Sequence, residues 1–212
     1  MEMMSMQLSA LVTAIVGWVA SILICALPMW RVTSFLGSNT MAAQSYSDGL
    51  WVTCAYEGTG QSQCRSYNSL LEITPDLQVA RVMVVSSLLT AFASILVSLA
   101  GRDFATCMGG ITRNRYTAVS GALFVVAGIL ILVPVSWTAS NIINNFYAPM
   151  GPEAVSRELG AALYIGWIAT ALLLSGGIIL SRLGTQYQQD SYKNYRGVKT
   201  CGPTGYPMKD YV

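Results

Sequence analysis

The chain has 212 residues, of which 53% are hydrophobic and 10% are charged, and its mean hydropathy is +0.50. This composition excludes a soluble globular domain and is typical of a protein that crosses a membrane. The net charge of +2 also argues against a nucleic-acid-binding surface, which needs a strongly basic patch.

Four long runs without a charged residue follow one another along the sequence. Each is long enough for the ~20 residues that cross a bilayer as a helix. They extend from Met3 to Trp30, from Val82 to Gly101, from Tyr116 to Pro152 and from Leu159 to Ser181. A cleaved signal peptide is the alternative for the first run, but Glu2 and the lack of a basic residue before the run favour a retained span.

We therefore expect four spans that separate two outer loops, one inner loop and a tail. The expected segments are an N-terminal segment over 1–7, spans over 8–28, 81–101, 117–137 and 160–181, outer loops over 29–80 and 138–159, an inner loop over 102–116 and a tail over 182–212. Three Lys or Arg residues fall in the inner loop and five in the tail, against four on the opposite side. By the positive-inside rule, both termini are expected in the cytoplasm.

The first outer loop contains short segments rich in β-branched and aromatic residues, such as Arg31 to Phe35 and Thr40 to Tyr46, which favour a small antiparallel sheet. Cys54 and Cys64 are separated by nine residues and flank the turn sequence from Glu57 to Gln61. This spacing predicts a disulfide-closed hairpin, which persists only outside the cytosol. Two unrelated free cysteines are the alternative.

The second span begins with residues that favour a helix start. Thr74 suits the N-cap, Pro75 the first helical position and Asp76 the first turn. Small residues also recur at helical spacing in the last three spans, which indicates helices that approach one another closely. They are Ser87, Ala91, Ser94, Ser98, Gly121, Gly128, Ala162, Gly166 and Thr170.

The helical pattern of the third span continues beyond the expected membrane boundary. It runs through apolar residues to Phe146 and Tyr147, and Pro149 is expected to end it. We therefore expect a helix that extends into water with two aromatic rings at its tip. The alternative is that these rings pack on the sheet.

After Arg182 the sequence loses its aliphatic periodicity, which predicts a disordered tail. The chain ends in Tyr211 and Val212. A free carboxylate on a small apolar residue is the kind of terminus that a PDZ groove binds by strand addition.

The sequence lacks the residues on which several chemistries depend. It has no histidine, no Cys-x-x-Cys motif and no phosphate-binding glycine loop, and the four apolar runs contain no Asp, Glu, Lys or Arg. Acid–base catalysis, zinc binding and proton relays use such residues. We therefore expect no enzymatic activity, no cofactor and no metal site.

Several residues of the first outer loop and its borders form a recognisable pattern. They are Trp30, Gly49, Leu50, Trp51, Cys54, Cys64 and Arg81. A four-span chain with this pattern resembles the claudins, from about Gln7 to Ser181 and again at the terminal Tyr-Val. The tryptophan and cysteine signature is shared with the peripheral myelin and AMPA-receptor auxiliary proteins, whereas the tail and second outer loop are more similar to claudins.

The resemblance implies an all-α membrane fold, a left-handed four-helix bundle with an extracellular five-stranded antiparallel sheet. It also implies a structural role at the plasma membrane, in which chains polymerise within one membrane and between cells into tight-junction strands. Phe146 and Tyr147 would belong to the adhesive tip, and the segment from Ser66 to Leu71 to the lateral contact. Tyr211 and Val212 would bind PDZ scaffolds of the zonula occludens type. Other claudins and membrane lipid are the further partners expected.

The sequence departs from the family pattern at two places. Many claudins carry paired juxtamembrane cysteines for acylation, whereas only Cys107 lies near the inner face here, so it is the one candidate for palmitoylation. The second outer loop reads Ala148-Pro149-Met150-Gly151-Pro152, unlike that of the enterotoxin-binding members. We therefore expect no strong toxin binding.

Arg65 stands directly after the second cysteine, where cation-conducting claudins often have an acidic residue. This position predicts a cation barrier or a weakly anion-preferring pore. Alternatively, Arg65 only pairs with Glu57 or another surface carboxylate, and Asp48 and Glu57 could offset its field. The alternative function is an auxiliary subunit that modulates a channel or receptor in the same membrane.

Overall fold

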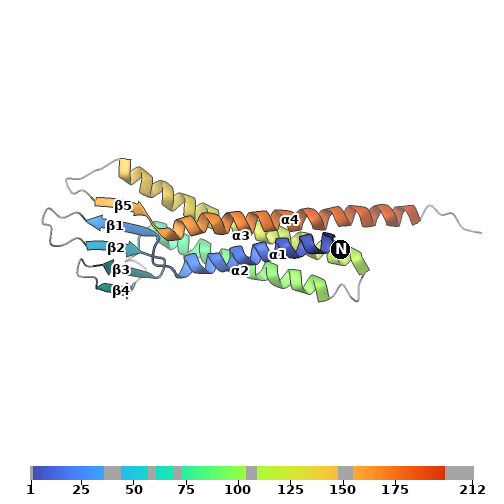
Figure 1. Ribbon diagram of the computed structural model, residues 1–212, viewed down its shortest axis with the longest axis horizontal. Helices are drawn as coiled ribbons and strands as arrows, with labels where there is room; N and C mark the ends of the chain where they lie inside the picture. The colour runs from blue at the N-terminus through green and yellow to red at the C-terminus, as the bar shows by residue number, and fades with distance from the viewer. Residues whose placement is uncertain are drawn as a thin grey trace, which may run out of the picture.

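The computed structural model describes residues 2–35, 44–56, 61–68, 73–103, 109–147 and 155–198. Four long helices lie side by side, and a five-stranded sheet covers one end of the bundle (Figure 1). The helices are α1 (Glu2–Ala26), α2 (Pro75–Asp103), α3 (Gly109–Tyr147) and α4 (Ala161–Val198). The strands are β1 (Arg31–Phe35), β2 (Gln44–Asp48), β3 (Val52–Tyr56), β4 (Ser62–Ser66) and β5 (Val155–Leu159). The predicted fold class is confirmed.

Each helix contains a segment long and apolar enough to cross a membrane. These segments are Ser5–Ala26, Pro75–Gly101, Arg115–Asn144 and Ala161–Gln186. Many large apolar side chains on their outer surfaces are exposed, because lipid rather than protein is their expected environment. Helix α2 begins at Pro75 as predicted, and the carbonyl of Thr74 accepts the backbone N–H groups of Leu77 and Gln78.

The small residues predicted to allow close helix packing lie between helices. The hydroxyls of Ser87 and Ser94, both buried on α2, donate to the backbone carbonyls of Ala127 and Ser120 on α3 at 2.7 and 2.6 Å. Gly121 of α3 lies so close to α4 that an added Cβ would be 2.4 Å from the backbone nitrogen of Ser181. The bundle is therefore held by close backbone approach as well as by apolar packing.

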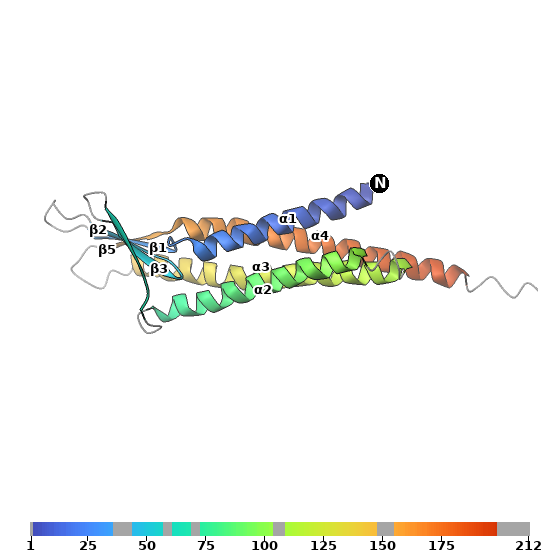
Figure 2. The ribbon, with the colours of Figure 1, turned by 90° about the horizontal axis from the view of Figure 1, so that it is seen from below.

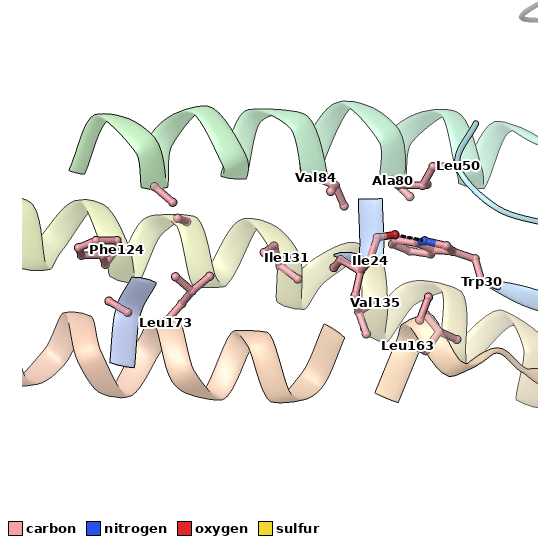
Figure 3. Close-up of a cluster of buried hydrophobic side chains, with 14 of the residues drawn as sticks. Ile24, Trp30, Leu50, Ala80, Val84, Phe124, Ile131, Val135, Leu163 and Leu173 are labelled. Atoms are coloured by element: carbon pink, nitrogen blue, oxygen red, sulfur yellow. Dashed lines mark hydrogen bonds between the residues drawn. The ribbon is translucent and has the colours of Figure 1, made fainter. Parts of the chain in front are cut away.

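The hydrophobic core runs along the axis of the bundle, and at the sheet end it is closed by Trp30 (Figure 3). Apolar side chains from all four helices contribute to it. Its largest fully buried members include Trp30, Phe124, Ile24, Leu50, Ile131, Leu163 and Leu173. The sheet is thus joined to the bundle by one continuous core rather than by a flexible linker.

The sheet has the order β4-β3-β2-β1-β5, and all its paired strands are antiparallel. Four strands come from the first loop, whereas β5 comes from the second and pairs with β1. The two loops therefore fold as one unit at the end of the bundle farthest from the N-terminus (Figure 2).

Two sequence predictions about boundaries were wrong. The second strand was expected to end at Tyr46, but β2 continues to Asp48, and the first part of the expected strand, over 40–43, lies outside the described residues. The tail was expected to be disordered from Arg182, but α4 continues to Val198. The first turns of this extension still bury Leu183, and Gly184 lies against the backbone of Ala118 on α3, so tertiary packing continues beyond the apolar run. The Gln, Tyr and Lys residues that follow are compatible with a helix although they form no apolar stripe.

Candidate functional site

Trp30 anchors the sheet in the bundle. Its side chain is 0% exposed, and its indole Nε1 donates to the carbonyl of Ile24 on α1 at 2.9 Å (Figure 3). Its backbone N–H donates to the carbonyl of Asp48 at the end of β2, also at 2.9 Å. Trp30 therefore satisfies its polar groups while it fills the junction between the first helix and the first two strands.

The Gly49-Leu50-Trp51 turn connects the sheet to α2 through Arg81. The guanidinium of Arg81 donates to the carbonyl of Leu50, with the Nε bond at 2.9 Å and a second bond from Nη2. It also lies 4.4 Å from the ring centroid of Trp51, a cation–π contact. Gly49 has no room for a side chain, because an added Cβ would be 2.4 Å from the Cα of Pro28. These residues thus form a structural clamp.

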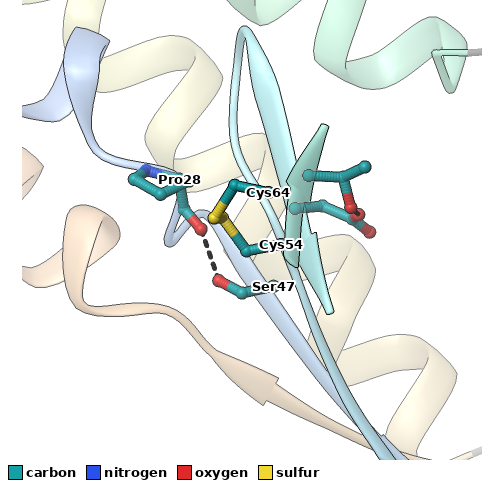
Figure 4. Close-up of a disulfide and its surroundings, with 6 residues drawn as sticks. Pro28, Ser47, Cys54 and Cys64 are labelled. Carbon is teal, nitrogen blue, oxygen red and sulfur yellow. Dashed lines mark hydrogen bonds between the residues drawn. A yellow bond between two sulfur atoms is a disulfide. The ribbon is translucent and has the colours of Figure 1, made fainter. Parts of the chain in front are cut away.

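A disulfide joins Cys54 of β3 to Cys64 of β4 (Figure 4). The two residues are direct partners in the antiparallel register, with their Cα atoms 4.0 Å apart. Cys54 is buried, and on the neighbouring strand Ser47 donates its hydroxyl to the carbonyl of Pro28. The disulfide therefore joins the outermost strand, β4, to the part of the sheet that rests on the bundle.

A polar cluster beneath the sheet was not predicted from the sequence. Arg31 at the start of β1 forms an ion pair with Asp76 of α2, with Nη2 and Oδ2 3.3 Å apart. Asn141 of α3 donates from Nδ2 to the same oxygen at 3.2 Å. The sequence predicts for Asp76 only a role at the start of the second helix. Its partners are 45 and 65 positions away, so local spacing carries no signal for this contact.

The register of the sheet places Arg65 in a row with Thr53, Asp48 and Arg31, on four successive strands. Directly opposed residues of a sheet share a face, and successive residues of a strand alternate between the two faces. Because Thr53 and Arg65 are next to Cys54 and Cys64, this row lies on the face opposite to that of the two cysteines. Asp48 accepts a hydrogen bond from Thr53 at 2.8 Å. Every residue of β4 is exposed, and Arg65 forms no ion pair with any residue that the structure describes.

Several predicted functional residues lie outside the described residues. They are Glu57, Cys107, Tyr211, Val212 and part of the segment from Ser66 to Leu71. For Phe146 and Tyr147 the structure describes the backbone, which forms the end of α3 as predicted, but not the side chains. In the described part of the chain, no group of three or more Cys, Asp or Glu residues is placed to hold a metal ion.

Comparison with known proteins gives a consistent result. The profile of the PMP-22/EMP/MP20/Claudin family matches residues 4–180. The chain is 42% identical to Claudin-3 of Homo sapiens over 219 residues, which cover 99% of each chain. It is 43% identical to Claudin-6 of Homo sapiens over 215 residues, which cover 98% of each, and 45% identical to Claudin-4 of Homo sapiens over 181 residues, 85% of this chain and 87% of the relative.

Proposed function

The chain belongs to the claudin family, and we propose that it forms tight-junction strands that act as a cation barrier or as a weakly anion-preferring pore. As a claudin, the chain is a multi-pass structural protein of tight junctions that associates with itself and with other claudins, and it is not an enzyme. The placement of Arg65 supports the proposed charge preference.

The charge on Arg65 is poorly compensated by its described neighbours. Asp48, the nearest carboxylate in its row, lies two strands away, or roughly 10 Å at the usual strand spacing. Screening in physiological salt acts over ~8 Å, so the two charges interact only weakly through solvent. The carboxylate of Asp48 is also already bonded to Thr53. The exposed strand β4 therefore presents a net positive charge to whatever space the sheet borders.

The size of the expected effect follows from simple electrostatics. At about 4 Å a unit charge changes the energy of a passing ion by roughly 1 kcal/mol in bulk water and by about 4 kcal/mol at an effective dielectric near 20. A difference of about 1.4 kcal/mol corresponds to tenfold in permeability. One arginine that lines the path is therefore sufficient to set the preference between Na⁺ and Cl⁻.

We predict that Arg65→Gln raises the permeability ratio of Na⁺ to Cl⁻ severalfold, up to about tenfold, because it removes the repulsion of cations. Arg65→Asp should raise the ratio further. The measurement is the dilution potential across an epithelial layer that expresses each variant at equal surface density.

Ser62→Glu is the matched control, because it changes the net charge by the same amount on the same exposed strand but on the opposite face of the sheet. Its effect on the ratio should be much smaller. An unchanged ratio in Arg65→Gln, or an equal rise in Ser62→Glu, would show that Arg65 does not line the ion path.

We also propose that both termini are cytoplasmic and that the tail binds PDZ scaffolds. The ribbon supports a shared side for the two termini, because the N-terminus and the extension of α4 both lie at the end of the bundle opposite to the sheet (Figure 1). With the disulfide-bonded sheet outside the cell, both ends lie inside, as the excess of Lys and Arg requires. Phe146 and Tyr147 then lie on the outer side, where we assign them to adhesion between cells.

Deletion of Val212 should abolish scaffold binding and leave the four-span fold intact, because a PDZ groove recognises the terminal carboxylate together with the last side chain. Pull-down of the full chain by isolated PDZ domains of the zonula occludens type measures this. Val212→Leu, which keeps an apolar last residue, should retain binding. Equal binding of the deletion variant and the intact chain would refute the assignment.

A further inference from the structure

A groove of about 360 Å³ lies between the outer ends of α2 and α3, immediately below the sheet. The two helices run side by side in both ribbon views (Figures 1 and 2). The residues that matter for its chemistry are Asp76, Val79 and Met83 of α2 and Val133, Pro134 and Trp137 of α3. All of them belong to the segments that are long and apolar enough to span a membrane. With the sheet outside the cell, as proposed above, the groove lies at the level of the outer leaflet.

The walls of the groove are apolar and accessible. Val79 is 59% exposed and Trp137 is 61% exposed, although both belong to membrane-spanning segments. From Asp76 to Met83 the groove follows seven helical steps, or roughly 10 Å along the axis. Pro134 and Trp137 contribute rigid rings to the opposite wall. These dimensions and surfaces suit a rigid apolar body that lies along the helices.

The polar group at the outer end of the groove is the carboxylate of Asp76. Both of its hydrogen bonds, from Arg31 and from Asn141, end on Oδ2. Within the described residues no group donates to Oδ1, and 39% of the side chain is exposed. Oδ1 is therefore available to accept a hydrogen bond from a molecule in the groove.

The negative charge of Asp76 at the outer end of the groove determines which kind of lipid can bind there. A phospholipid would bring its phosphate close to a carboxylate, and the guanidinium of Arg31 is already paired with Asp76. A neutral lipid whose hydroxyl can donate avoids this repulsion. We propose that the groove binds one membrane sterol, with its hydroxyl donating to Oδ1 of Asp76 and its ring system lying along Val79, Val133 and Trp137. This site is independent of the proposed charge selectivity.

The test uses the full chain reconstituted in phosphatidylcholine vesicles that contain a photoreactive analogue of cholesterol with its 3-hydroxyl retained. Illumination should label peptides that contain residues 76–83 and 133–137 in preference to the other lipid-facing segments. Unlabelled cholesterol should compete, whereas the corresponding 3-ketone, which cannot donate a hydrogen bond, should compete far less.

Val79→Trp should fill the groove and lower labelling about tenfold, whereas Val82→Trp should leave it within about twofold. Val82 is the matched control because it is 69% exposed on the same helix and does not line the groove. Val133→Trp provides a second filling variant from α3, should Val79→Trp fail to fold. Labelling spread evenly over all four helices, equal labelling in the filled and control variants, or preferential labelling of the same peptides by a photoreactive phospholipid would each overturn the proposal.

Discussion

Replacement of Trp30 by alanine should lower the apparent unfolding midpoint of the protein in detergent by roughly 6–20 °C. Truncation of a fully buried aromatic side chain costs about 3–5 kcal/mol, and 1 kcal/mol corresponds to roughly 2–4 °C in a chain of this size. Trp30 is 0% exposed and closes the core where the sheet meets the bundle. Its loss would also leave the carbonyl of Ile24 without the indole donor.

Two further variants separate the contributions of Trp30. Trp30→Phe retains most of the side-chain volume, so it should cost less than the alanine variant. It should still cost something, because it removes the indole N–H that donates to Ile24. Tyr164→Ala, which removes an exposed aromatic ring from α4, should cost little. Thermal melts followed by size-exclusion chromatography measure all three. A midpoint for Trp30→Ala equal to that of Tyr164→Ala would contradict the assignment of Trp30 as the anchor.

Gly160→Ala should be comparably damaging, for a different reason. Gly160 connects β5 to α4 and lies directly against the chain between α1 and β1. An added Cβ would be 1.9 Å from the carbonyl oxygen of Met29 and 2.8 Å from the carbonyl carbon of Trp30. These atoms belong to the backbone, which also accepts the N–H groups of Gly160 and Ala162, so they cannot move without breaking those hydrogen bonds. We expect a cost of about 3 kcal/mol or more, which is at the upper end for overpacking.

Gly128→Ala is the control for this prediction. Its added Cβ would meet the side-chain end of Leu174, which can move, at 2.9 Å. Because alanine also favours a helix over glycine by about 1 kcal/mol, this variant should be close to neutral. The same thermal melts compare the two variants. Similar midpoints for Gly160→Ala and Gly128→Ala would show that the junction is not tightly packed.

The parts of the fold that depend on local sequence were predictable. Long uncharged runs identified the four helices, and the Thr74-Pro75-Asp76 sequence located the start of α2. The apolar pattern beyond Trp137 identified the extension of α3 to Tyr147. In each case the signal is a short-range pattern of burial or helix capping, which a sequence displays directly.

The parts that depend on contacts between distant segments were not predictable from the residues. The pairing of β5 with β1 unites two loops that are separated by more than half of the chain, and local propensity does not specify such a partner. The convergence of Arg31 and Asn141 on Asp76 likewise depends on how three elements dock. The length of α4 was missed because its extension beyond Arg182 has no apolar stripe to signal it.

We propose that this chain alone is sufficient to form tight-junction strands. Freeze-fracture imaging of contacts between cells that lack junctional strands and express this chain alone is the most direct test. We predict continuous strands at contacts where both cells express it, and none at contacts with non-expressing cells. Normal surface expression at such contacts without strands would contradict the claim and would favour an auxiliary subunit that acts within a single membrane.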